Sequence, residues 1–153
     1  PTADVFTTQY SGRVNASGGR EYVAYCWTAV SGVSAFGTYE GGPNGSEAKT
    51  TLDFRPRWIM VKEIDTGSAY TSWTIIDAFR ASFGTGTTTL TSGNAKALYA
   101  NLSKVENQRG GSSTATDLTE VVIYDDGFKM TSGSADVDES NWNGKTYIYA
   151  AFA

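Results

Sequence analysis

Apolar residues in this chain occur in short runs, and turn-forming glycine, asparagine and aspartate separate these runs. The runs "RWIMVKEI" (Arg57–Ile64) and "LTEVVIY" (Leu118–Tyr124) are too short for stable helices and are rich in β-branched and aromatic residues. With 17 glycines and 13% aromatic residues, the composition is that of a folded, turn-rich chain. The pattern predicts an all-β fold, an antiparallel and jelly-roll-like β-sandwich with at most one short helix, over Ala95–Leu102.

Several strands are expected at definite positions. Besides those two runs, Ser72–Asp77 and Lys145–Ala153 are predicted strands. The Thr66–Ser68 turn predicts a hairpin between Arg57–Ile64 and Ser72–Asp77. Asp126-Gly127 predicts a second hairpin, between Leu118–Tyr124 and Phe128–Thr131. The Thr-, Ser- and Gly-rich segments 84–93 and 110–116 are expected to be long exposed loops.

The segment "EYVAYCWTAV" (Glu21–Val30) is the most apolar stretch near the N-terminus. Tyr22, Ala24 and Cys26 alternate with Val23, Tyr25 and Trp27, so both faces of a strand here would be apolar. The segment is therefore predicted to be a central strand. No cation or histidine adjoins Cys26, so its thiol is predicted to be buried and unreactive.

Composition excludes several classes of protein. The chain of 153 residues is predicted to be a single domain, either whole or as a processed part of a longer protein. It contains no histidine and one cysteine, which rules out Ser-His and Cys-His catalytic pairs, histidine metal ligands and an intrachain disulfide. The net charge of -4 with scattered basic residues argues against nucleic-acid binding. No cofactor, metal or membrane insertion is expected.

Three aromatic residues beside polar turns are candidate ligand contacts. Trp142 lies in the polar turn "ESNWNGK", Tyr70 beside the turn at 66–72, and Tyr39 before Glu40-Gly41. Exposed tryptophan and tyrosine rings stack on the apolar faces of sugars, so these side chains predict carbohydrate binding. The alternative is that the rings fold back onto the sheet or lie in a subunit interface.

Acidic residues gather in two places and leave other functions open. Two acids brought together could act as a glycosidase pair or hold calcium. Solvated or turn-forming acids are the commoner outcome. The residues concerned are Asp125, Asp126, Asp136, Asp138 and Glu139.

Two segments of the chain are similar in sequence. "GREYVAYCW" (Gly19–Trp27) parallels "GKTYIYAAF" (Gly144–Phe152), with Tyr22 matching Tyr147. Two readings remain open: the likeness is the general likeness of buried strands, or the chain is one copy of a tandem array.

Six motifs together resemble one family of domains. The family is repeated in tail-fibre and other virion-surface proteins of marine and cyanobacterial tailed phages, and its function is mostly unassigned. The motifs are "YVAYCWTAVSGVSAFGTYEGG", "FRPRWIMVKEID", "WTIIDAFR", "LYANLSKVEN", "DDGFKMTS" and "NGKTYIYAAFA". They are structural motifs and carry over no catalytic residue.

The resemblance implies a non-enzymatic structural protein on the surface of a phage virion, made in the host cytoplasm. The expected role is a tail-fibre or appendage domain that binds host surface polysaccharide. The alternative is a capsid decoration or head-fibre protein bound to the major capsid protein. Either role implies other virion proteins as partners and a homo-oligomer, with a trimer favoured for a fibre. The third and least favoured hypothesis is a glycan-cleaving enzyme.

Overall fold

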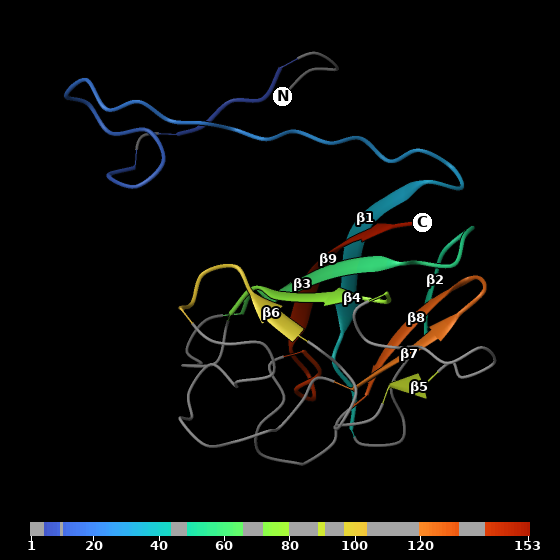
Figure 1. The fold of residues 1–153 in the computed structure, drawn as a ribbon. Helices are drawn as coiled ribbons and strands as arrows, with labels where there is room; N and C mark the ends of the chain where they lie inside the picture. The colour runs from blue at the N-terminus through green and yellow to red at the C-terminus, as the bar shows by residue number, and fades with distance from the viewer. Residues whose placement is uncertain are drawn as a thin grey trace.

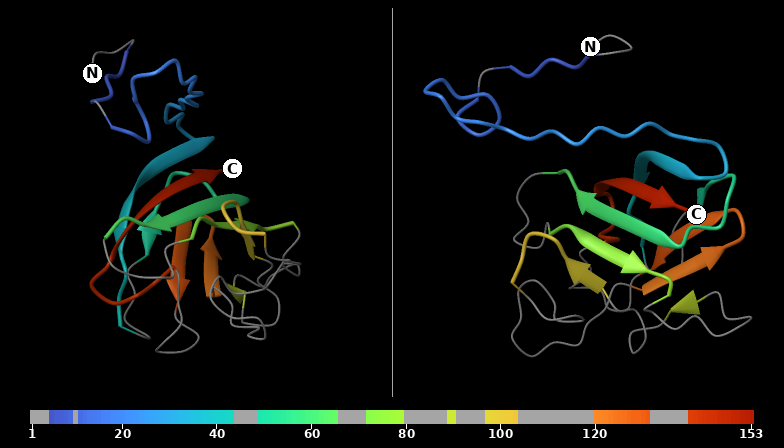
Figure 2. Two further views of the ribbon diagram at one scale, coloured as in Figure 1. Left: turned by 90° about the vertical axis from the view of Figure 1, so that its left-hand side faces the viewer. Right: turned by 45° about the horizontal axis from the view of Figure 1, so that its top comes forward.

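The computed structural model describes residues 5–9, 11–43, 49–65, 72–79, 89–90, 97–103, 120–131 and 140–153. Within these residues, strands form two antiparallel sheets that pack face to face (Figures 1 and 2). The all-β, sandwich-like prediction is confirmed. None of the described residues belongs to a helix that is long and apolar enough to span a membrane.

The larger sheet has five strands in the order β1-β9-β3-β4-β6. Their bounds are β1 Ser34–Glu40, β3 Trp58–Glu63, β4 Thr74–Asp77, β6 Ala97–Tyr99 and β9 Thr146–Phe152. The predicted strands at Arg57–Ile64, Ser72–Asp77 and Lys145–Ala153 are confirmed as β3, β4 and β9. β3 and β4 pair antiparallel, as a hairpin requires, although the turn that joins them lies outside the described residues.

The smaller sheet has four strands in the order β2-β8-β7-β5. Their bounds are β2 Thr50–Thr51, β5 Thr89–Leu90, β7 Glu120–Tyr124 and β8 Gly127–Thr131. The β7–β8 hairpin confirms the turn prediction, with Tyr124 paired to Gly127. Gly127 has φ 143°, a conformation that L side chains rarely adopt, which explains the glycine after Asp126.

The core lies between the two sheets and follows the alternation of side chains along the strands. β3 contributes Ile59 and Val61, while the neighbouring positions Trp58 and Met60 face the other side. The buried cluster consists of Leu52, Phe54, Ile59, Val61, Ile76, Val121, Ile123, Phe128, Met130 and Ala151. Members of both sheets take part, so the cluster holds the sandwich together.

The prediction of a central strand over Glu21–Val30 is wrong. Residues 21–29 form no strand and every one of them is exposed. Figure 1 shows them as part of an extended N-terminal arm, which consists of the described residues before β1 and lies above the five-stranded sheet. Cys26 is consequently an exposed free thiol, so the prediction of its burial is also wrong. An alternating apolar pattern buries its residues only where a neighbouring strand or sheet is present to cover them.

Two smaller expectations are also corrected. Ala97–Tyr99, in the segment expected to be a short helix, forms β6, because Ala97 and Tyr99 are buried when they pair beside β4. Thr89–Leu90, in the expected loop 84–93, forms β5 beside β7. The expected loop at 110–116 lies outside the described residues. Tertiary pairing overrides local propensity at both corrected places.

Candidate functional site

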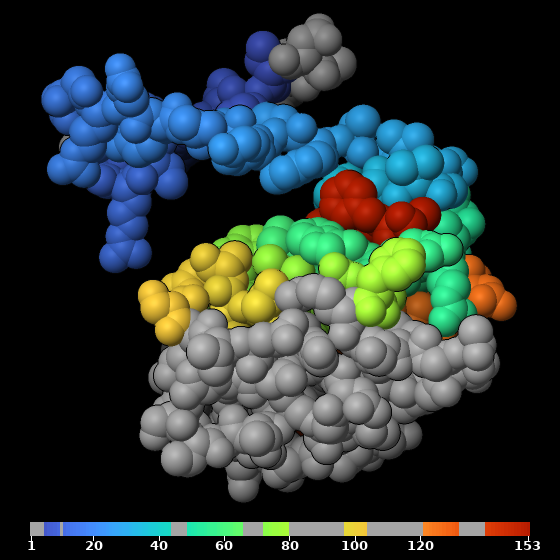
Figure 3. Space-filling model, viewed as in Figure 1, coloured from blue at the N-terminus to red at the C-terminus, as the bar shows by residue number. Residues whose placement is uncertain are grey.

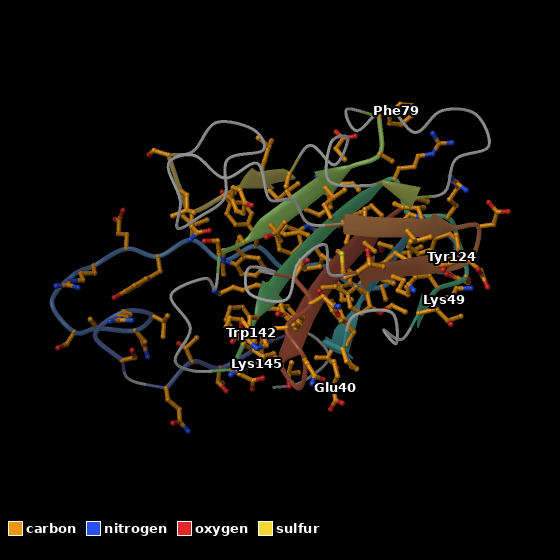
Figure 4. The ribbon with its side chains drawn as sticks, turned by 90° about the horizontal axis from the view of Figure 1, so that it is seen from below. Glu40, Lys49, Phe79, Tyr124, Trp142 and Lys145 are labelled. Carbon is orange, nitrogen blue, oxygen red and sulfur yellow. The ribbon has the colours of Figure 1, made fainter. Side chains whose placement is uncertain are left out.

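The turn at residues 140–145 presents the best candidate for ligand contact. It leads into β9 and carries Trp142, which is 41% exposed. Figure 4 shows Trp142, Lys145 and Glu40 at the same end of the molecule. This exposure agrees with the prediction that the Trp142 side chain faces solvent.

Hydrogen bonds from buried residues hold this turn in place. The backbone N–H of Trp142 donates to the Tyr147 hydroxyl at 2.8 Å. The Asn141 side chain accepts from Gly42 N–H at 3.1 Å and donates to the Gly42 carbonyl at 3.3 Å. Because Asn141 and Tyr147 are buried, little freedom remains for the backbone beneath the Trp142 ring.

Tyr39 packs beneath the turn at 140–145 and does not offer an exposed ring for sugar binding. Its ring is partly buried, stacks on Tyr147 at 5.0 Å between centroids, and meets Phe128 edge-on at 6.1 Å. Its hydroxyl donates to the Ser140 carbonyl at 2.5 Å. The Tyr39 ring therefore folds back onto the sheet, which was the alternative to an exposed, sugar-binding position. Tyr70 lies outside the described residues.

The backbone directly after β1 approaches the turn closely at Gly41. Gly41 N–H donates to the Lys145 carbonyl at 2.8 Å, and Gly144 N–H donates to the Gly41 carbonyl at 3.0 Å. A Cβ atom at position 41 would overlap the carbonyl group of Trp142. The chain therefore needs glycine here for space. Gly41, Asn141 and Tyr147 shape the candidate site, and the tight "NWNG" turn was the only sequence signal that pointed to them.

An ion pair lies at the root of the same turn. Glu63, at the end of β3, is 2% exposed, and its Oε1 atom lies 3.8 Å from Lys145 Nζ. Neighbouring Asp65 accepts a hydrogen bond from Thr146 N–H at 2.6 Å. Burial raises the pKa of the Glu63 carboxyl, with Lys145 opposing this rise and Asp65 adding to it.

A Glu63→Gln variant is expected to change how stability depends on pH. Because the folded-state pKa of Glu63 lies above the ordinary value of 4.5, the unfolded chain releases this proton first. The stabilisation of the folded state by the protonated Glu63 carboxyl is complete below pH 4.5. It is lost as pH rises through the folded-state pKa of this group. Urea unfolding from pH 3 to 8 should show the wild type losing stability relative to Glu63→Gln as pH rises. A difference that stays constant with pH would contradict this account.

The acids of the β7–β8 turn have structural partners. Asp125 pairs with Arg55 at 3.0 Å, and Asp126 pairs with Lys49. The hydrogen bond from Lys49 lowers the pKa of Asp126. Asp136, Asp138 and Glu139 lie outside the described residues. Among the residues that the structure describes, no three metal-ligating side chains come together.

A second candidate surface is the outer face of the five-stranded sheet, on the side away from the core. A hollow of about 370 Å³ lies there, between the arm and the sheet. It is lined by Trp27, Phe36, Trp58, Met60, Ala150 and Phe152. Phe152 meets Phe36 and Trp58 edge-on, at 5.7 and 5.5 Å. Sequence reasoning missed this face, although both alternating positions of "RWIMVKEI" are apolar, which is a usable signal.

Residues 1–153 match the family described as "Domain of unknown function (DUF7483)". The chain belongs to this family. No curated protein and no solved structure matches the chain. Membership of the DUF7483 family assigns neither a ligand nor a partner.

Proposed function

We propose that this DUF7483 domain is a non-enzymatic structural module of a phage virion surface, in a tail fibre or appendage, that binds host glycan. The observation that carries the binding role is Trp142, exposed on a turn that buried hydrogen bonds hold in place. Because the backbone that carries the ring is already held in place, little backbone entropy is lost when the ring stacks against a sugar. Glu40 and Lys145 lie at the same end of the molecule as Trp142 (Figure 4), and charged side chains of these kinds form hydrogen bonds with hydroxyl groups.

The phage assignment rests on the six sequence motifs, and the architecture is compatible with it. A stiff sandwich that displays loops at its ends suits a surface protein. The proposed partners are other virion proteins and host cell-surface polysaccharide. The proposed assembly is a homo-oligomer, with three copies favoured.

A Trp142→Ala variant tests the glycan site. On an array of host surface polysaccharides, removal of the ring should lower affinity at least about tenfold, the effect of losing a central aromatic contact. Phe79→Ala is the matched control, because Phe79 is also exposed and follows β4 at the opposite end of the sheet (Figure 4). Equal binding by wild type and Trp142→Ala, or no binding by any of the three proteins, would remove glycan recognition from the proposal.

The apolar outer face favours a second candidate role. The side chains around the hollow are almost wholly apolar and offer few hydrogen bonds to sugar hydroxyl groups, so the hollow suits contact with another protein better than contact with a sugar. The second candidate is therefore a capsid decoration or head-fibre protein bound to the major capsid protein. Labelling the protein on virions separates the two roles: a few copies at the tail support the fibre, and hundreds over the head support decoration.

A further inference from the structure

The N-terminal arm exposes a row of large apolar side chains. Val23 is 78% exposed and Tyr25 is 76% exposed, with Tyr22 and Trp27 also open to solvent. Figure 3 shows the arm standing clear of the body over most of its length. Leaving such a row in water is unfavourable, and contiguous exposed apolar side chains mark interaction surfaces.

The root of the arm is fixed even though the arm itself is extended. Ser34 N–H donates to the Val30 carbonyl at 2.8 Å, which closes a tight turn before β1. Asp53 accepts hydrogen bonds from Ser31 Oγ at 2.5 Å and from Gly32 N–H at 2.8 Å. These two bonds lower the pKa of Asp53. The arm therefore leaves the body from a defined point.

The sequence of the arm matches that of a strand already in the sheet. Gly19–Trp27 parallels Gly144–Phe152, which includes β9. β9 is the antiparallel partner of β1, and β1 is the edge strand of the five-stranded sheet. One side of β1 holds β9, and its other side is at the sheet edge. Among the described strands, none pairs with that second side of β1. A strand with the sequence pattern of β9 is thus suited to it.

A hairpin that continues the Val30–Ser34 bridge within the chain cannot keep Trp27 where it lies. The Val30–Ser34 bridge, continued as a hairpin, would place Trp27 opposite Gly37. Gly37 pairs with Tyr149, which faces the core. Trp27 instead lines the hollow on the outer face, beside Phe36 and Trp58. Since side chains of a strand alternate between faces, the hairpin register sends Trp27 to the wrong side.

We propose that the arm pairs with β1 of a second copy of the chain, in the register that β9 uses. Trp27 then lies opposite Ser34, as Phe152 does in β9. Small side chains face small ones on the core side, where Ala24 meets Gly37 and Cys26 meets Ala35. On the outer face, the large rings of the incoming arm gather with Phe36 over the hollow.

This exchange makes every copy both a donor and an acceptor, so it gives a symmetric ring where the rotation between copies closes and an open filament where it does not. It does not depend on glycan binding, because the arm departs from the Ser34 end of β1. The Trp142 turn lies at the Glu40 end. Failure of one proposal therefore leaves the other standing.

An engineered disulfide tests the register directly. Directly opposed residues of antiparallel strands have Cα atoms about 4.5–5.5 Å apart, within the range of a disulfide. Since Cys26 is the only cysteine, Ala35→Cys provides one new partner. Oxidation of both thiols by diamide, which is reduced to its hydrazine, should join position 26 of one chain to position 35 of another. We expect most of the protein to migrate as covalent dimers or larger species, with this linkage identified by mass spectrometry.

Thr38→Cys is the matched control. A hairpin within one chain would place Cys26 opposite position 38 and give an internal disulfide, which leaves the protein monomeric on a denaturing gel. Efficient internal linkage in Thr38→Cys would overturn the exchange. So would a failure of Ala35→Cys to exceed the cross-linking that wild type shows through Cys26 alone.

The mass in solution gives a second measurement that needs no disulfide. By light scattering, the wild-type chain should have a multiple of its monomer mass of 16.4 kDa, and a trimer would match the proposed fibre. The double variant Tyr25→Ser, Trp27→Ser should be a monomer, while Val14→Ser, also exposed in the arm but outside the β9-like stretch, should keep the wild-type mass. A monomeric wild type at 100 µM, or a double variant that stays oligomeric, would contradict the proposal.

Discussion

Phe128→Ala is expected to lower the free energy of unfolding by about 3–5 kcal/mol, the usual cost of removing a fully buried phenylalanine. Phe128 lies on β8 and is completely buried. Its ring meets Tyr39 of β1 and Tyr149 of β9 edge-on, at 6.1 and 5.4 Å. The side chain thus joins the two sheets, and its removal leaves a cavity that neither sheet can close alone.

Urea or thermal unfolding of the purified domain measures this change. Phe79→Ala removes the same group from a side chain that is exposed, so its cost should stay below about 1 kcal/mol. Equal effects of the two substitutions would mean that Phe128 does not lie between the sheets, and the sandwich packing would be wrong.

Strands with a clear local signal could be predicted from the sequence. β3, β7, β8 and β9 have alternating or β-branched runs bounded by turn residues, and each was placed within two residues of its ends. The Asp126-Gly127 turn also specified its hairpin, because few residues other than glycine adopt its positive φ. Local chemistry was sufficient for these elements.

The strands that depend on distant partners could not be predicted in the same way. Ser34–Glu40 has a glycine at its centre and was not predicted to be a strand, yet it forms β1 because β9 lies beside it. Glu21–Val30 has the stronger strand pattern, yet no described strand of its own chain covers it. The alternation of side chains specifies what a segment can pair with, and the global topology decides whether a partner is available.

The candidate site shows the same limit. Trp142 and Tyr39 look alike in sequence, since each is an aromatic residue beside a glycine-containing turn. Tyr39 lies opposite Tyr147 in the β1–β9 pairing and therefore faces the core. Trp142 lies in the turn outside the strands and remains exposed. Register separates the two roles, and register depends on contacts about one hundred residues apart in the chain.

Gly41→Ala should damage both the fold and the proposed glycan site. A Cβ at this position would meet the carbonyl group of Trp142, with the carbonyl carbon at 2.8 Å, and Asn141 C at 3.0 Å. All of these are backbone atoms, so no side chain can rotate away and the 140–145 turn must move. Overpacking of this kind costs about 1–3 kcal/mol.

Movement of the turn also breaks the hydrogen bonds that orient Trp142, so glycan affinity should decrease along with stability. Denaturant unfolding and the glycan array measure the two effects on one preparation. Gly12→Ala is the control, because its added Cβ would meet no atom within 4 Å, and both properties should stay at wild-type values. A Gly41→Ala variant that lost stability but kept full glycan affinity would contradict this account. Trp142 would then bind glycan without the turn that holds its backbone in place.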